Sequence, residues 1–342
     1  MKILVTGGLG YIGSHTVVEL LSQNFEVLII DDLSNSRREV LRGIHAITGI
    51  TPQFEEFDLC DSNRLDYFFK SNPDIDAIIH FAASKAVGES VENPIKYYRN
   101  NLASLLNLME GMIRYNIKNL VFSSSCTVYG QPDVLPVTES SPVLAAESPY
   151  GNTKQISEEI IRDVLKANPD LCAIALRYFN PVGAHPSALI GELPLGVPNN
   201  LVPFITQTAA GIREVLNVFG DDYNTPDGSA IRDYIHVVDL AQAHIVALNR
   251  MIGGRQKSIF EVFNLGTGNG YSVLEVIAAF ERATGRKLNY KIVGRRAGDI
   301  EKVWADTSLA NSELGWKAQK EIDEMMASAW KWQQQLVADA GD

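Results

Sequence analysis

A glycine-rich turn close to the N-terminus constrains the fold more than any other part of the sequence. The residues G-L-G-Y-I-G at 8–13 match the pattern G-x-G-x-x-G and lie between an apolar segment at 2–6 and a segment with helical periodicity at 12–21. Glycines there let the backbone approach a pyrophosphate and leave helix N-terminal amides facing its charge. A plain β-α turn is the alternative, but the flanking strand and helix favour a dinucleotide-binding turn.

Short apolar segments rich in Ile, Val and Phe recur along the first half of the chain, and stretches with helical periodicity separate them. These segments are residues 2–6, 26–30, 53–57, 77–81, 120–124 and 172–178. Apolar strands that alternate with helices indicate a parallel sheet covered on both faces. The sequence therefore predicts an α/β fold with a Rossmann-type doubly wound parallel sheet, whose functional groups lie at the carboxyl ends of the strands.

The pattern changes after residue 180, where a stretch rich in Pro and Gly extends over residues 181–203. Such a stretch indicates a crossing into a second lobe. We predict a dinucleotide-binding domain at 1–180 and a smaller mixed α/β C-terminal substrate lobe at 181–342. The boundary is soft, and segments of the chain can cross back over it.

The composition excludes several classes of protein. The 342 residues are 46% hydrophobic and carry a net charge of -11, so the chain resembles a soluble globular protein and has no field to attract nucleic acid or an anionic membrane. It has no run of 18 apolar residues and no signal-peptide core. Cys60, Cys126 and Cys172 are odd in number and, like the histidines, lack metal-binding spacing. We expect reduced thiols, no metal and a cytoplasmic location.

Acidic residues follow the second apolar segment. Asp31 and Asp32 lie near the offset of ~20 residues at which a carboxylate binds the ribose hydroxyls of a dinucleotide. A carboxylate repels a 2′-phosphate, which favours NAD over NADP, although Arg37 and Arg38 are near enough to keep NADP open. Strand ends supply further expected contacts at Asp58, Leu59, Phe81, Ala82 and Ala83, although small residues there are also ordinary packing.

A tyrosine and a lysine four residues apart form the candidate catalytic pair. Tyr150 and Lys154 lie one turn apart on one helix face, and Ser125 ends a neighbouring apolar strand. This set suits removal of a proton from a carbinol while its hydride leaves to NAD. A cation ~4 Å away at a dielectric of ~20 is worth ~4 kcal/mol, enough to lower the tyrosine pKa from ~10 to ~7. Y-x-x-x-K alone is common by chance, but the glycine turn favours the catalytic interpretation.

Longer motifs resemble a known family. T-G-G-x-G-Y-I-G at 6–13, S-S-S-x-T-V-Y-G at 123–130 and S-P-Y-x-x-x-K at 148–154 resemble the extended short-chain dehydrogenase/reductases. Motifs in both lobes narrow the resemblance to the UDP-glucose 4-epimerase family over almost the whole chain. They include L-R-Y-F-N-P-V-G-A-H-P at 176–186, P-N-N-L at 198–201, R-D-Y-I-H-V at 232–237 and R-R-x-G-D at 295–299.

The resemblance implies an NAD-dependent isomerase that interconverts UDP-glucose and UDP-galactose. Hydride leaves C4 of the sugar, the 4-keto sugar rotates about its diphosphate, and hydride returns to the other face. By position, Tyr150 is the base, Lys154 its electrostatic partner and Ser125 the hydrogen-bond partner of the sugar hydroxyl. The family also suggests a homodimer, for which helices at 93–115 and 150–166 offer apolar faces that could equally be internal core.

Two sets of binding residues follow from the resemblance and the strand ends. The expected cofactor contacts are Gly7, Gly10, Tyr11, Ile12, Gly13, Asp31, Asp32, Asn35, Ser36, Asp58, Leu59, Phe81, Ala82, Ala83, Lys85, Asn100, Ser125, Tyr150, Lys154, Tyr178 and Phe179. The expected UDP-sugar contacts are Ser125, Tyr150, Asn180, Asn200, Leu201, Asn217, Phe219, Arg232, Arg296, Asp299 and Val303. Arg232 and Arg296 also suit a diphosphate on physical grounds, with an ordinary surface salt bridge as the alternative.

The chain departs from the family pattern in places. Asp32 stands where the family often has Asn, and Val303 occupies a position beside the sugar that ranges from Tyr to small residues. A valine there predicts room for an N-acetyl group, and so activity on UDP-N-acetylglucosamine and UDP-N-acetylgalactosamine at a lower specificity constant. A nucleotide-sugar 4,6-dehydratase is an alternative, but it needs an acid-base pair where this chain has Cys126 and Thr127. A catalytically inactive NAD-binding scaffold is another, which the intact serine, tyrosine and lysine disfavour.

Overall fold

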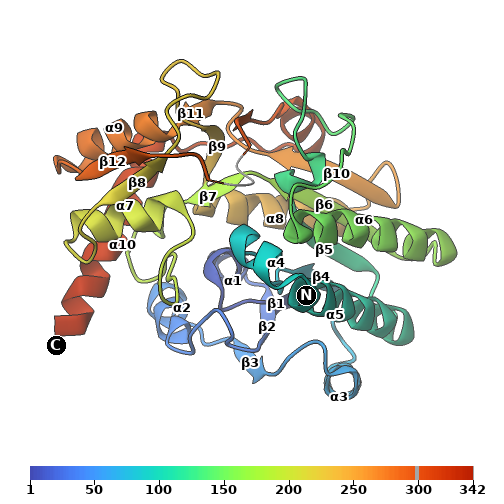
Figure 1. Cartoon of the computed structure of the whole chain (residues 1–342). Helices are drawn as coiled ribbons and strands as arrows, with labels where there is room; N and C mark the ends of the chain where they lie inside the picture. The colour runs from blue at the N-terminus through green and yellow to red at the C-terminus, as the bar shows by residue number, and fades with distance from the viewer. Residues whose placement is uncertain (297–299, 342) are drawn as a thin grey trace.

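The computed structural model describes residues 1–296 and 300–341, and within them a seven-stranded parallel sheet forms the centre of the molecule (Figure 1). The strand order is β10-β6-β5-β4-β1-β2-β3. The strands are β1 (Lys2–Thr6), β2 (Glu26–Asp31), β3 (Gln53–Glu56), β4 (Ala77–His80), β5 (Asn119–Ser125), β6 (Cys172–Tyr178) and β10 (Phe260–Leu265). The predicted fold class is confirmed, and the ends of the six predicted strands differ from the expected ones by one residue at most, whereas β10 was not predicted.

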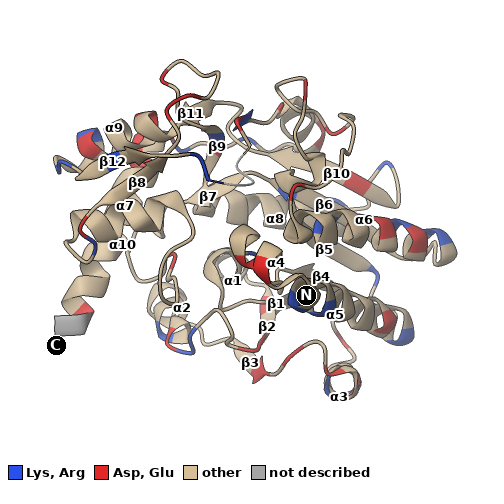
Figure 2. Ribbon diagram, viewed as in Figure 1, with Lys and Arg blue, Asp and Glu red and all other residues tan. Residues whose placement is uncertain are grey.

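Helices cover both faces of this sheet because successive residues of each strand point to opposite sides. Ile3 and Val5 of β1 pack in one cluster with α1 (Tyr11–Ser22), α2 (Val40–Thr48) and α8 (Val237–Ile252). Leu4 points the other way and packs with α3 (Ser62–Ser71), α5 (Pro94–Tyr115) and α6 (Pro149–Ala167). Basic and acidic residues both occur along α5 and α6 (Figure 2).

A smaller mixed lobe lies beyond the carboxyl ends of the strands. Its central strand, β9 (Ile231–His236), pairs with β7 (Asn180–Val182), β11 (Gly270–Ser272) and β13 (Lys302–Val303), while β8 (Leu216–Phe219) pairs with β12 (Tyr290–Val293). Three helices, α7 (Leu201–Ala209), α9 (Val273–Thr284) and α10 (Ile322–Gly341), pack around these strands. Short helical segments complete the fold at α4 (Val87–Glu92), η1 (Cys126–Tyr129) and η2 (Ala310–Leu314).

The chain crosses between the two lobes more than once. Helix α8 and strand β10 come from the second half of the sequence, yet α8 packs on α1 and β10 pairs with β6 at the edge of the large sheet. A domain boundary at residue 180 therefore matches the order of the elements along the chain. It does not match their packing, because α8 and β10 come after residue 180 and pack with the first domain. Within the described ranges, none of the helices is both long and apolar enough to cross a membrane.

Candidate active site

The glycine turn joins β1 to α1 at the carboxyl edge of the sheet. Gly7 has φ +68°, and a Cβ there would lie 2.8 Å from the Ala82 nitrogen, while a Cβ at Gly13 would lie 2.2 Å from the Gly7 oxygen. Helix α1 begins after Gly10, which makes no side-chain cap, and its first turn carries no acidic residue. The amides that open α1 are thus left for an external anion, which fits a dinucleotide pyrophosphate.

The carboxylate at the end of β2 organises the adjacent loop. Asp31 is buried, and its Oδ2 accepts a hydrogen bond from the Leu9 amide at 3.0 Å. Its Oδ1 accepts from the Leu33 amide at 3.0 Å and the Ser36 hydroxyl at 2.7 Å. Burial raises the pKa of Asp31, and these hydrogen bonds oppose that rise. Asp31 and Ser36 therefore lie together beside the turn, whereas the Asp32 side chain is exposed and Asn35 is also exposed.

The loop after β4 lies opposite, with Ala82 against Gly7. Asn101, which the sequence analysis missed, holds this loop: its Oδ1 accepts from the Ser84 amide at 2.8 Å, and its Nδ2 donates to the Thr153 hydroxyl at 3.0 Å. The neighbouring Asn100 donates to the Ser84 hydroxyl at 3.2 Å. The available sequence signal for Asn101 was its spacing of four residues from Tyr97 and Leu105, which places a polar amide on the mainly apolar face of the helix.

Ser125, Tyr150 and Lys154 come together where β5 ends and α6 begins. Lys154 Nζ donates to the Ser123 main-chain oxygen at 2.7 Å and lies 6.0 Å from the Tyr150 ring centroid. The Ser125 hydroxyl accepts a hydrogen bond from the Thr127 hydroxyl at 3.0 Å and interacts with Tyr150. All three predicted catalytic side chains are buried.

The electrostatics of this group correct one expectation. Burial raises the pKa of Tyr150 above its usual value, and the Ser125 hydroxyl opposes that rise. Burial lowers the pKa of Lys154 to about 8, while Glu158 works in the other direction. The expected lowering of the Tyr150 pKa to ~7 by Lys154 alone was wrong, because burial dominates and raises the pKa of Tyr150.

Apart from Ser125 and Tyr150, the expected UDP-sugar contacts lie on the elements of the second lobe or at its border. Asn180 opens β7, Leu201 opens α7, and Asn217 on β8 has a buried Oδ1 without a hydrogen-bond partner in the described structure. The Arg296 guanidinium lies 5.5 Å from the ring centroid of Phe219. Asp299 lies outside the described residues.

Arg232 and Val303 are register partners on β9 and β13. Arg232 Nη1 donates to the Ile231 main-chain oxygen at 2.8 Å. Val303 is only 3% exposed and packs in one apolar cluster with Phe179, against which Cys126 also packs. A predicted cofactor contact and a predicted sugar contact are therefore brought together in this cluster.

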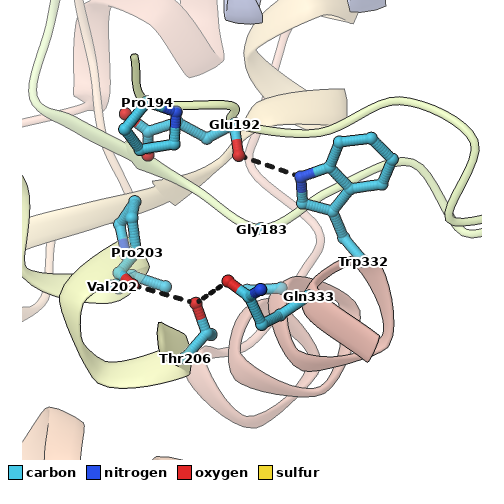
Figure 3. A pocket seen from close by; sticks show the side chains of 9 residues that line it. Gly183, Glu192, Pro194, Val202, Pro203, Thr206, Trp332 and Gln333 are labelled. Carbon is cyan, nitrogen blue, oxygen red and sulfur yellow. Dashed lines mark hydrogen bonds between the residues drawn. The ribbon is translucent and has the colours of Figure 1, made fainter. Parts of the chain in front are cut away.

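Glu192 links the two lobes, and the sequence analysis missed it. Its Oε1 accepts from Asn200 Nδ2 at 2.6 Å and lies 3.5 Å from Lys85 Nζ. Its main-chain oxygen accepts from the Trp332 indole at 2.9 Å, across the small pocket between α7 and α10 (Figure 3). An acidic residue in an irregular Pro- and Gly-rich stretch carries no local signal of these distant partners.

Comparison with known proteins places the chain in a family. A family model described as GDP-mannose 4,6 dehydratase matches residues 4–329. UDP-glucose 4-epimerase of Yersinia enterocolitica is 52% identical over 333 residues, which cover 97% of each chain. The human UDP-glucose 4-epimerase is 50% identical over 346 residues, which cover 99% of this chain and 98% of the human one. The chain belongs to the UDP-glucose 4-epimerase family.

A solved structure extends the similarity to the whole fold. The UDP-glucose 4-epimerase from Bifidobacterium longum, in complex with NAD+ and UDP, has a TM-score of 0.94 to this chain at 48% identity and covers 98% of both chains. Membership of the UDP-glucose 4-epimerase family agrees with the residues beside Ser125. Burial raises the pKa of the Cys126 thiol to about 12, and Thr127 carries only a hydroxyl, so neither supplies the acid-base pair that a dehydratase needs there.

Proposed function

We propose that this chain epimerises UDP-hexoses at C4 with NAD, interconverting UDP-glucose and UDP-galactose through a 4-keto sugar. The observation that carries the proposal is the convergence of Ser125, Tyr150 and Lys154 at the end of β5, on the same sheet edge as the glycine turn. The fold alone would not justify a proposed activity, because many unrelated functions share it. This set of side chains does support one, because these are the groups that would act on the sugar hydroxyl. The similarity to UDP-glucose 4-epimerases along nearly the full length supports it.

The glycine turn and Asp31 hold the cofactor in this proposal. Gly7 and Gly13 allow the close backbone packing that shapes this turn, the amides that open α1 would bind the pyrophosphate, and Asp31 would bind the ribose. When bound, NAD supplies the hydride acceptor and the positive charge of its oxidised ring. The remaining cofactor contacts expected from the sequence are part of the proposal.

The protein's own groups move the proton. Tyr150 accepts the proton of the C4 hydroxyl and later returns it, while the Ser125 hydroxyl holds the same oxygen. Lys154 places a positive charge near Tyr150, which favours the phenolate that burial disfavours. A general base of this kind contributes about 10²–10⁴-fold to the rate.

The second lobe holds the UDP moiety. Arg232 and Arg296 pair with the diphosphate, which suits planar guanidinium donors on a protein with net charge -11. The unpartnered Oδ1 of Asn217 is an acceptor ready for a donor on the ligand, and Phe219 is 37% exposed on the same strand. Asn180, Asn200, Leu201, Asp299 and Val303 complete the proposed set.

A single assay tests the activity. Purified protein is incubated with UDP-galactose without added cofactor, and UDP-glucose is measured by chromatography. We expect interconversion in both directions, and denatured protein should release near-stoichiometric NAD or NADH. Protein that carries no nucleotide and accumulates NADH from added NAD would contradict the epimerase cycle, and formation of a 4-keto-6-deoxy sugar would favour the dehydratase.

We also propose that the chain is a cytoplasmic homodimer. Each chain would have a cofactor domain at 1–180 and a substrate lobe at 181–342, from which α8 and β10 cross back to the large sheet. Exposed apolar side chains support a dimer surface: Val91 on α4 is 61% exposed, and Ile95 on α5 is 69% exposed. Ile95→Asp should shift the molar mass measured by light scattering from that of two chains to that of one. A wild-type protein that elutes as a monomer would remove the dimer from the proposal.

A further inference from the structure

A buried carboxylate lies behind the catalytic group and has no role in the mechanism above. Glu158 on α6 has a side chain 4% exposed. Its Oε1 accepts from the Ser124 hydroxyl at 2.6 Å and from Arg177 Nε at 2.9 Å, and its Oε2 accepts from Arg177 Nη2 at 2.6 Å. Ser124 and Arg177 are register partners on β5 and β6. One carboxylate thus connects α6 to β5 and β6. Its partner on β5, Ser124, is the residue immediately before Ser125.

The same carboxylate lies one helical turn from Lys154, because residues four apart share a helix face. Two buried cations, Lys154 and Arg177, therefore share Glu158 as their nearby anion. Burial lowers the pKa of Lys154 to about 8, and Glu158 opposes that decrease. A buried cation without an anion tends to lose its proton, so the charge of Lys154 depends on this neighbour.

Other groups that face Lys154 do not replace Glu158. Tyr150 precedes it on α6, and β5 contributes the neutral carbonyl of Ser123 and the Phe122 ring. His80 on β4 is neutral, because burial and then the Lys154 ammonium lower its pKa to about 3. From β6, Arg177 adds only positive charge.

Arg177 is itself held in place. Its guanidinium carbon lies 4.9 Å from the ring centroid of Tyr129, and the Tyr129 hydroxyl donates to Asn264 Oδ1 at 2.6 Å. The bidentate pair with Glu158 therefore has little freedom to rearrange. The carboxylate stays where it can act on both cations.

We propose that Glu158 is a positioning residue for the reaction: it fixes the turn of α6 that carries Lys154 against β5 and keeps Lys154 positively charged during turnover. This inference rests on the proposed function, since it concerns the charge that supports Tyr150. It differs from a purely structural role, because a clamp would affect stability and rate without moving the pH dependence.

The test compares pH profiles of kcat for epimerisation. Wild-type kcat should fall as pH rises through the Lys154 pKa near 8. Glu158→Gln keeps the size of the side chain and removes its charge, so the Lys154 pKa decreases further and the fall should begin about one pH unit lower. Glu158→Asp retains the charge and should return the midpoint toward the wild-type value. Ser124→Ala removes one hydrogen bond without a charge and should leave the midpoint in place.

A second variant covers the possibility that Glu158→Gln does not fold, since it leaves the Arg177 charge buried and unpaired. Glu158→Gln/Arg177→Met removes both charges of the pair and still deprives Lys154 of its nearest anion. A downward shift of the midpoint supports the proposal, and it should be smaller than in Glu158→Gln because loss of the Arg177 charge by itself raises the Lys154 pKa. A folded variant of either kind whose profile superimposes on that of wild type overturns it. An inactive wild-type protein would instead reject the proposed function, and that measurement is made first.

Discussion

The ammonium of Lys154 lies 6.0 Å from the centre of the Tyr150 ring and donates a hydrogen bond to the Ser123 main-chain oxygen. A nearby ammonium favours a phenolate, but the main influences on the Tyr150 pKa are burial, Tyr178 and the Ser125 hydroxyl. Burial of Tyr150 has the largest effect, since the pKa of Tyr150 is raised overall. The protein's own groups therefore supply only part of the activation of this base.

Tyr150→Phe tests the identity of the base. Removing the phenolic oxygen should lower kcat by at least ~100-fold, the usual cost of a lost general base, while the protein still folds and binds UDP-sugar. Steady-state rates measure the change in kcat, and calorimetric titration with UDP measures nucleotide binding separately. Tyr67→Phe, at a position 72% exposed, is the control for loss of a hydroxyl. A Tyr150→Phe enzyme with near-normal kcat would exclude tyrosine from the mechanism.

Lys154→Met tests the charge that supports Tyr150. The wild-type ammonium is protonated below its pKa of about 8 and is lost as pH rises through that value. Without it, the Tyr150 pKa rises further, so kcat should fall at neutral pH and the optimum should move to higher pH. The pH profile of kcat from pH 6 to 10 measures this. Lys166→Met, on the same helix with a side chain 66% exposed, should keep the wild-type profile.

Much of the fold and of the catalytic group could be predicted because the signals are local. The strands are continuous apolar segments, and Tyr150 and Lys154 share one helix turn, so sequence spacing alone brings them together. Glu192 and Glu158 could not be found in this way. Their partners, Asn200 and Arg177, lie on other elements, and only tertiary packing brings each pair within hydrogen-bond distance.

Glu192 should affect substrate binding more than turnover. It contacts Lys85, an expected cofactor contact, and Asn200, an expected UDP-sugar contact. Its bond to Asn200 is to a charged group, worth about 1.5–3 kcal/mol, whereas a partly exposed pair such as that with Lys85 is worth about 0.2–1 kcal/mol. Glu192→Gln keeps an acceptor for Asn200 and loses mainly the ion pair with Lys85, so it should raise KM for UDP-glucose by less than ~5-fold. Glu192→Ala loses both and should raise KM by ~10-fold or more.

A double-mutant cycle with Lys85→Met separates these contributions. The combined Lys85→Met/Glu192→Gln variant should be little worse than the poorer single variant, since each removes the same ion pair. Unchanged KM in Glu192→Ala would show that the carboxylate does not orient Asn200 for the ligand.

Substrate range depends on Val303, which packs beside Phe179 and Cys126 at the end of β13. A short β-branched side chain here should leave room for an N-acetyl group, so the enzyme should act on UDP-N-acetylglucosamine at a lower kcat/KM than on UDP-glucose. Val303→Ala should increase the ratio of N-acetyl to plain activity. Val303→Tyr should decrease it by ~5-fold or more, since one change of size in a pocket is worth about 1–3 kcal/mol. The six kcat/KM values, for three proteins and two substrates, come from the same chromatographic assay.

Val303 is buried, so a tyrosine there can also strain the cluster, at a cost of about 1–3 kcal/mol. Such strain would lower kcat/KM for both substrates equally. A bulky side chain that narrows the sugar pocket would instead change the ratio of the two kcat/KM values. Val137→Ala provides the matched control, because Val137 is a fully buried member of the same cluster and no sugar contact is expected there. Its ratio should equal that of wild type. If wild type lacks N-acetyl activity, or if Val303→Tyr leaves the ratio unchanged, Val303 does not set the substrate range.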